Sequence, residues 1–144
     1  MSDSPPLVCN YTDPISVVES FIVAMNQWET AACQAAREAR HTADPSSHWG
    51  PVQNAMDCIF SLYCTARERP HGRHSSFSKP PQYNPANEHV ISSLEHGKKW
   101  HVETQRDHPL YGGKLLYVMQ KVGGEWRIDS VKIMQGATWR PTTL

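Results

Sequence analysis

The sequence of 144 residues carries 14 lysines and arginines against 14 aspartates and glutamates, and 39% of its residues are hydrophobic. This length suits one domain with a buried core, and the hydrophobic content with five tryptophans excludes a disordered chain. The neutral balance argues against a general nucleic-acid-binding or membrane-surface protein. The start MSDSPPLVCN lacks a basic segment followed by an apolar one, so we expect no signal peptide and a cytoplasmic protein.

The charges are distributed unevenly along the chain. Residues 1–66 carry two basic and seven acidic side chains, a net charge of −5, whereas residues 67–144 carry twelve basic and seven acidic side chains, a net charge of +5. The acidic half is predicted to be helical and the basic half to form strands. The two layers should therefore present different electrostatic potentials to a partner. No C-x-x-C pair occurs among the four cysteines, which we expect to be reduced thiols.

The first half of the chain predicts an arm and two helices. Residues 1–12 contain two prolines and few anchoring side chains, which is typical of a loose arm. A helix is predicted to begin at Asp13-Pro14, because aspartate is a favoured N-cap and proline is favoured at the first helical position. Apolar residues follow at helical spacing for roughly seven turns, until Pro45 ends the pattern. A second helix with Pro51 in its first turn is predicted to follow, led by Ser46, Ser47 or Gly50.

The segment 66–88 changes character, because it holds four prolines and little periodicity and is basic over residues 67–79. We interpret it as a long solvated connection. It contains His71 and His74, with Cys64 before and His89 after. Zinc sites take their ligands from tighter paired motifs, so we expect no metal site here.

Strand patterns dominate the rest of the chain. Residues 89–95 and 99–106 read as two strands that turn at His96-Gly97. The clearest prediction is a β-hairpin over residues 114–134, because Gly123-Gly124 suits a two-residue type I′ or II′ loop.

The register of that hairpin follows from its turn. Val122 is expected to face Glu125. The antiparallel pairing then continues from Lys121 opposite Trp126 to Leu115 opposite Lys132, with Val118 facing Asp129. Along both expected faces apolar residues give way to polar ones. Such a crossover indicates a strongly twisted or bulged sheet.

Helices followed by a four-strand antiparallel meander make an α+β domain, in which a bent sheet covers the apolar faces of the helices. We place this domain at residues 13–136, after the arm of residues 1–12 and before a C-terminal tail at residues 137–144, with Trp139 on the sheet edge. Such wrapping leaves a concave pocket between the two layers.

Four segments follow one another in a specific order. They are F-x-x-A-M-N-x-W-E at residues 21–29, Y-x-P-x-x-E at residues 83–88, V-E-T at residues 102–104, and Y-V-M with G-G-E-W-R-I-D-S over residues 117–130. As an ordered set they resemble the immunity proteins of bacterial polymorphic toxin systems with a nuclear transport factor 2-like fold. The resemblance implies N-terminal helices packed in a strongly curved antiparallel sheet, a cone. It also implies a non-catalytic protein that binds and neutralises a cognate toxin domain, without a cofactor.

A second function stays open at this point. The same fold hosts small-molecule isomerases, dehydratases and ligand-binding proteins that use the cone pocket. For such a protein His101 and Asp129 are the best candidates for general acid–base chemistry, because both lie on strands near aromatic residues. The competing interpretation of Asp129 is an ion pair with Arg127 or Lys114.

For the immunity function we predict toxin contacts on the open face of the sheet and on residues 67–82, because tryptophan, tyrosine and arginine are enriched at interface centres. Representative contacts are Arg73, Trp100, Arg106 and Tyr117. The competing surface is the acidic helical layer, represented by Glu19, Glu29 and Glu38. We expect neither a membrane nor a nucleic acid as partner, and a homodimer through the sheet is a further option.

Overall fold

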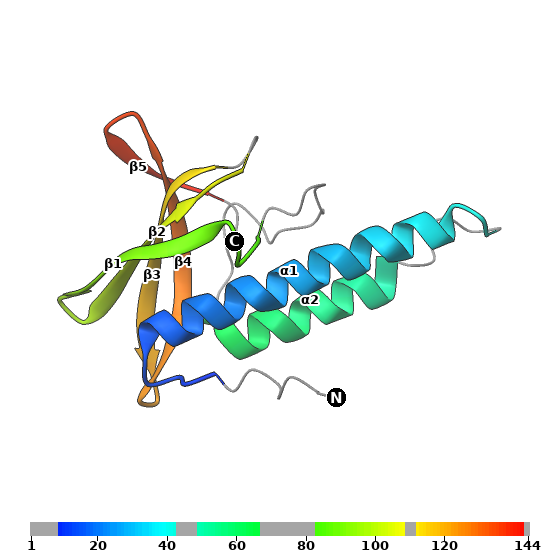
Figure 1. Cartoon of the computed structure of the whole chain (residues 1–144). Helices are drawn as coiled ribbons and strands as arrows, with labels where there is room; N and C mark the ends of the chain where they lie inside the picture. Colours follow the sequence, from blue (N-terminus) through cyan, green and yellow to red (C-terminus); the bar gives the residue numbers. More distant parts are fainter. Residues whose placement is uncertain (1–8, 43–48, 67–82, 109–111, 143–144) are drawn as a thin grey trace, which may run out of the picture.

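A computed structural model describes residues 9–42, 49–66, 83–108 and 112–142 (Figure 1). In this part of the chain two helices lie side by side and meet one face of an antiparallel sheet. The helices are α1 (Pro14–Ala39) and α2 (Trp49–Tyr63). The strands are β1 (Glu88–His96), β2 (Lys99–Arg106), β3 (Gly113–Val122), β4 (Glu125–Gln135) and β5 (Thr138–Pro141), paired in chain order. The predicted α+β class, with N-terminal helices packed on an antiparallel sheet, is confirmed.

The sheet has one strand more than the sequence predicts. Residues 138–141 fall in the predicted tail, but they form β5 and pair with the end of β4, with Trp139 opposite Met134. The turn between them contains Gly136, whose φ of 64° suits glycine. Trp139 therefore lies at the sheet edge as predicted, but as part of the sheet.

The start of α1 follows the predicted chemistry. The Asp13 side chain accepts a hydrogen bond from the Ile15 N–H at 3.0 Å, and Pro14 is the first helical residue. The helix ends at Ala39, earlier than the predicted stop at Pro45, and Pro51 lies in the first turn of α2 as predicted. Neither helix is long and apolar enough to cross a membrane, among the residues described.

The core lies between the helices and the facing side of the sheet. Phe21 of α1 is fully buried, with its ring edge-on to Phe60 of α2 at 6.0 Å and to Tyr83 at 5.5 Å between ring centres. From the sheet, Met119 and Ile128 are also fully buried in this cluster. Burial of each such side chain contributes roughly 1.5–3 kcal/mol. The helical stripe and one face of the strands thus form a single core.

The β3–β4 hairpin turns at Gly123 and Gly124 as predicted, with φ of 58° and 83°. The four pairs from Val122–Glu125 to Met119–Ile128 are the predicted ones. The register then shifts by one residue, so that Val118 pairs with Ser130 instead of Asp129. The predicted pairs beyond this point are wrong for that reason. The shift is a β-bulge, which the crossover of polar and apolar residues indicated.

The two edges of the sheet differ. Along β4 the Trp126 N–H donates to the Tyr11 carbonyl at 2.8 Å, the Thr65 N–H donates to the Ile128 carbonyl at 2.9 Å, and β5 pairs with the last residues. Tyr11 also stacks on Tyr63 of α2, so the end of the predicted loose arm is anchored, whereas residues 1–8 lie outside the described residues. At the other edge, β1 pairs with β2 alone among the described strands.

Candidate functional site

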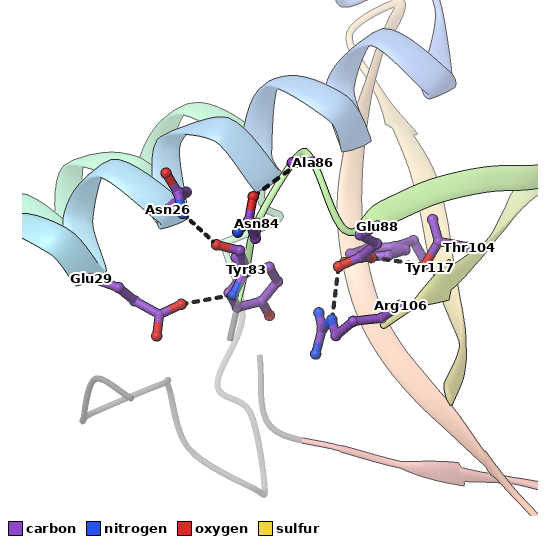
Figure 2. Close-up of polar contacts among 9 residues, drawn as sticks. All are labelled: Asn26, Glu29, Tyr83, Asn84, Ala86, Glu88, Thr104, Arg106 and Tyr117. Atoms are coloured by element: carbon purple, nitrogen blue, oxygen red, sulfur yellow. Dashed lines mark hydrogen bonds and ion pairs between the residues drawn. The ribbon is translucent and has the colours of Figure 1, made fainter. Parts of the chain in front are cut away.

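A buried polar cluster joins the first three strands around Glu88 (Figure 2). The Glu88 side chain is fully buried at the start of β1. One carboxylate oxygen accepts hydrogen bonds from the Thr104 hydroxyl at 2.8 Å and the Tyr117 hydroxyl at 2.7 Å, and the other accepts one from Arg106 Nε at 2.8 Å. Because these partners come from β2 and β3, a single carboxylate connects three neighbouring strands.

Helix α1 holds the other side of the same cluster. The Tyr83 N–H donates to Glu29 Oε1 at 2.9 Å, and Asn26 Nδ2 donates to the Tyr83 carbonyl at 2.8 Å (Figure 2). The guanidinium carbon of Arg106 lies 4.7 Å from the centre of the Tyr83 ring, within the range of a cation–π contact. The segment from Tyr83 to Glu88 is therefore fixed to the helix at one end and to the sheet at the other.

Local sequence explains how these groups reach their positions. Asn26 and Glu29 are three residues apart and so lie on one face of α1. The segment 83–88 turns tightly, since the Asn84 side chain accepts from the Ala86 N–H at 2.9 Å and the Asn84 carbonyl accepts from the Asn87 N–H at 2.9 Å. The turn reverses the chain between the helix contact and the first residue of β1.

The electrostatics of the cluster favour one protonation state. Burial raises the pKa of Tyr117 well above its usual value, and the charge of Glu88 raises it further. Burial likewise raises the pKa of Tyr83. Burial alone would lower the pKa of Arg106, but Tyr117, Glu88 and Tyr83 outweigh it and the net pKa is raised. General acid–base chemistry needs a pKa near the working pH. The tyrosines and Arg106 are instead held as permanent donors, which suits a structural role.

Two residues predicted to contact a partner belong to this cluster. Arg106 is 2% exposed and Tyr117 is fully buried, so the prediction that both stand on the open face of the sheet is wrong. Alternation along β2 turns Trp100, Val102, Thr104 and Arg106 toward the helices. Trp100 is half-buried on that side, with its ring edge-on to Trp126 at 5.7 Å.

Other predicted contacts fall elsewhere. Glu29, one representative of the competing acidic surface, is fully buried by its contact with Tyr83 and cannot present a charge to solvent. Arg73, His71 and His74 lie outside the described residues, with the whole segment 67–82. Within the described ranges no three His, Cys, Asp or Glu side chains gather closely enough to hold a metal ion.

His101 lies on the side of the sheet that faces away from the helices, because its neighbours Trp100 and Val102 face the core. Its ring lies 4.4 Å from the ring of His96 across the β1–β2 hairpin. Partial burial, followed by the charges of His96, Lys132 and Lys99, lowers the pKa of His101. At neutral pH His101 is therefore a neutral imidazole, although it lies near the basic residues Lys132 and Lys99.

Asp129 lies at the β-bulge, between Ile128, which is opposite Met119, and Ser130, which is opposite Val118. Its carboxylate accepts a hydrogen bond from the Thr65 hydroxyl at 2.9 Å and lies 3.9 Å from Lys99 Nζ. The ion pair predicted for Asp129 exists, but with Lys99 instead of Arg127 or Lys114. Arg127 pairs with Glu125 at 2.9 Å.

A pocket of about 440 Å³ opens between α1 and the start of β1. Its lining residues are Glu19, Ile22, Val23, Pro85, Glu88, His89 and Val90. Neither His101 nor Asp129 lines it. The structure therefore does not bring the two candidate acid–base residues together in this pocket.

The sequence pattern placed Glu29 on an exposed acidic surface and Glu88 only in a family-like segment, so the buried contacts of both residues were missed. For Glu29 a signal of burial was present. Ile22, Met25, Glu29 and Ala32 follow helical spacing on the buried stripe of α1, so a carboxylate occupies a core position. A charged residue in such a register indicates a buried hydrogen-bonded partner. For Glu88 the sequence offers no comparable pattern, because its partners lie on other strands.

The comparison with known proteins agrees with this architecture. The family model described as NTF2 fold immunity protein matches residues 13–140. Immunity protein RhsIA from Dickeya dadantii (strain 3937) is 34% identical over 115 residues, which cover 78% of this chain and 81% of that protein. No solved structure matches the chain significantly. The matched region contains both helices, the buried cluster and the sheet, and the chain belongs to the family of NTF2 fold immunity proteins.

Proposed function

We propose that this protein is an immunity protein that binds a cognate toxin domain and neutralises it without catalysis. The observation that carries the proposal is membership of the immunity family over residues 13–140. The relative in Dickeya dadantii bears the name of an immunity protein as well.

The buried cluster supports the non-catalytic part of this proposal. The groups that make the family-like segments recognisable, such as Glu29, Tyr83 and Glu88, hydrogen-bond to other parts of the protein. These contacts fix the helices to the sheet, although Glu88 also lines the pocket beside α1. A scaffold fixed in this way displays its surface residues in one geometry, which reduces the entropy lost when a partner binds.

Co-expression tests the proposal. Each toxin gene adjacent to the gene for this protein is expressed in a sensitive host, with and without this protein, and growth is followed. We expect one of these toxins to arrest growth alone and to be neutralised in the presence of this protein. The purified pair, with the toxin inactivated at its catalytic residue, should elute together in size-exclusion chromatography. Failure of both rescue and co-elution with every adjacent toxin would refute the proposal.

One double variant separates binding from catalysis. His101→Gln combined with Asp129→Asn removes the two side chains that would carry acid–base chemistry. We expect this variant still to protect the host and still to bind a catalytically inactive toxin. Because His101 lies on the outward side of the β1–β2 hairpin, any loss of affinity that its replacement causes should appear in binding and in protection together. If protection were lost while binding to the inactive toxin stayed unchanged, an enzymatic mode of protection would replace direct neutralisation.

A further inference from the structure

The β1–β2 hairpin carries a distinct group of residues on the side away from the helices. Leu94 pairs with His101 and His96 pairs with Lys99, and the alternation that turns Trp100 to the core turns these four outward. Lys98 lies in the turn between the strands. We call Leu94, His96, Lys98, Lys99 and His101 the hairpin patch.

The hairpin patch is accessible. Leu94 is 67% exposed, more than the other large exposed hydrophobic residues in the described part of the chain, of which Leu62 is next at 52%. His96, Lys98 and Lys99 are exposed and His101 is partly so. Figure 1 shows the β1–β2 turn reaching past the start of α1, clear of the helical layer. A flat partner could therefore approach this face without meeting the helices.

The charge of the hairpin patch is positive. Lys98 and Lys99 supply its positive charge, and the rings of His96 and His101 lie beside them, 4.4 Å apart. Asp129 faces Lys99 at 3.9 Å, but it is 5% exposed and already accepts from Thr65, so its charge is largely hidden from a partner.

An exposed leucine alone is common on protein surfaces. Here the leucine lies opposite His101, and the next outward pair along the hairpin is His96 with Lys99, an arrangement that resembles the apolar centre and polar rim of a protein interface. The competing helical surface is less uniform. Its exposed acids Glu19 and Glu38 are far apart along α1, and Glu38 lies beside Arg37 and Arg40.

We propose that the hairpin patch is the toxin-binding surface, and that it takes an acidic face of the toxin with an apolar recess for Leu94. This inference rests on the proposed immunity function, because it names the surface through which that function acts. Leu94 supplies desolvated contact area, which sets the rate of dissociation. The cations steer association, so their effect is strongest at low salt.

Two pairs of matched variants test the inference. Leu94→Ser and Lys98→Glu change the hairpin patch, and neither side chain takes part in the buried cluster. Val122→Ser and Lys121→Glu are the controls at the tip of the β3–β4 hairpin, where Val122 is 51% exposed. Thermal melts first establish that all four variants fold. Association and dissociation rates are then measured against purified toxin, inactivated at its catalytic residue, at about 50 mM and about 500 mM salt.

We expect Leu94→Ser to raise Kd by about tenfold or more, mainly through faster dissociation. Lys98→Glu should slow association several-fold at low salt, and the difference should vanish at high salt. Both controls should stay within about twofold of the wild type.

The outcomes separate this inference from the proposed function. If the wild type binds and protects but both patch variants match it, the hairpin patch is wrong and the immunity function stands. If Val122→Ser or Lys121→Glu weakens binding instead, the interface lies elsewhere. If a short oligonucleotide binds the wild type but not Lys98→Glu, while toxin binding is the same for both, the hairpin patch is a nucleic-acid-binding surface instead. If the wild type binds no toxin, the function itself falls.

Discussion

Replacement of Glu88 by alanine tests the role of the buried cluster most directly. The substitution removes the acceptor of three hydrogen bonds, from Thr104, Tyr117 and Arg106. It also leaves the Arg106 guanidinium, which is 2% exposed, without its carboxylate. The perturbation therefore chiefly removes the ion-pair partner of a buried charge.

The size of the effect follows from that charge. Removal of one member of a buried ion pair costs about 3–5 kcal/mol. Domains of ordinary size have a free energy of unfolding of about 5–15 kcal/mol, so Glu88→Ala should remove a substantial part of the total. For a domain of about this length each kcal/mol lowers Tm by about 2–4 °C, which predicts a fall of about 6–20 °C.

Urea and thermal melts followed by circular dichroism measure the effect. Tyr117→Phe is the graded comparison, because it removes one hydroxyl and should cost about 1–2 kcal/mol. Glu95→Ala is the matched control, since Glu95 lies on the same strand but is exposed, and it should change stability by less than about 0.5 kcal/mol. The double change Glu88→Leu with Arg106→Met should recover part of the loss, because it leaves no unpaired charge.

A loss below about 1 kcal/mol in Glu88→Ala would refute the reasoning. It would mean that water or a rearranged side chain replaces the carboxylate at little cost. A double variant less stable than Glu88→Ala alone would also contradict the assigned role, since the penalty would then come from lost packing.

Three further predictions concern local structure. Asp13→Ala should lower the free energy of unfolding by about 1 kcal/mol through loss of the N-cap hydrogen bond, and a urea melt with no shift would contradict it. Valine at both Gly123 and Gly124 should destabilise the fold by more than about 2 kcal/mol, because both φ angles are positive. Gly50→Ala is the control in open space on α2 and should be neutral or stabilising, so equal losses would argue against the turn geometry. Burial and neighbouring cations lower the pKa of His101 in the folded state, so the unfolded chain holds that proton more tightly. Its contribution to stability is full above the usual pKa of 6.5 and declines as the pH falls through that value. His101→Gln should flatten this part of the decline in melts from about pH 8 to about pH 5.5, and an identical profile would rule it out.

The sequence predicted those features of the fold that depend on local chemistry. Asp13-Pro14 marks the start of α1, and Gly123-Gly124 marks the hairpin, because each dipeptide restricts its own backbone. The predicted pairs next to the turn are correct for the same reason.

Features that depend on distant partners could not be predicted in this way. The bulge at Asp129 was indicated only as a tendency of the hairpin. At that position Asp129 accepts a hydrogen bond from Thr65, 64 residues earlier in the chain, which no local pattern reveals. β5 was assigned to the tail because residues 138–141 show no strand pattern without the edge of β4 beside them.

Arg106 shows the same limit at the candidate site. Arginine is enriched at interface centres, which favoured a contact on the open face. Its planar group of donors suits a buried carboxylate equally well, and Glu88 occupies the opposite position on β1. Composition cannot separate these two uses. The pairing of the strands does.

The buried cluster has a consequence for how such proteins diversify. Substitutions within the cluster are expected to cost several kcal/mol, whereas most substitutions on the outer face of the β1–β2 hairpin cost about 0.5 kcal/mol or less. Selection for a folded protein therefore restrains the interior and leaves the exterior free to change. Two descendants of one ancestor could keep the same Glu29, Tyr83 and Glu88 contacts and yet protect their hosts against unrelated toxins. Members of this family would then resemble one another mainly in their buried residues, and differ in binding specificity mainly through their surface residues.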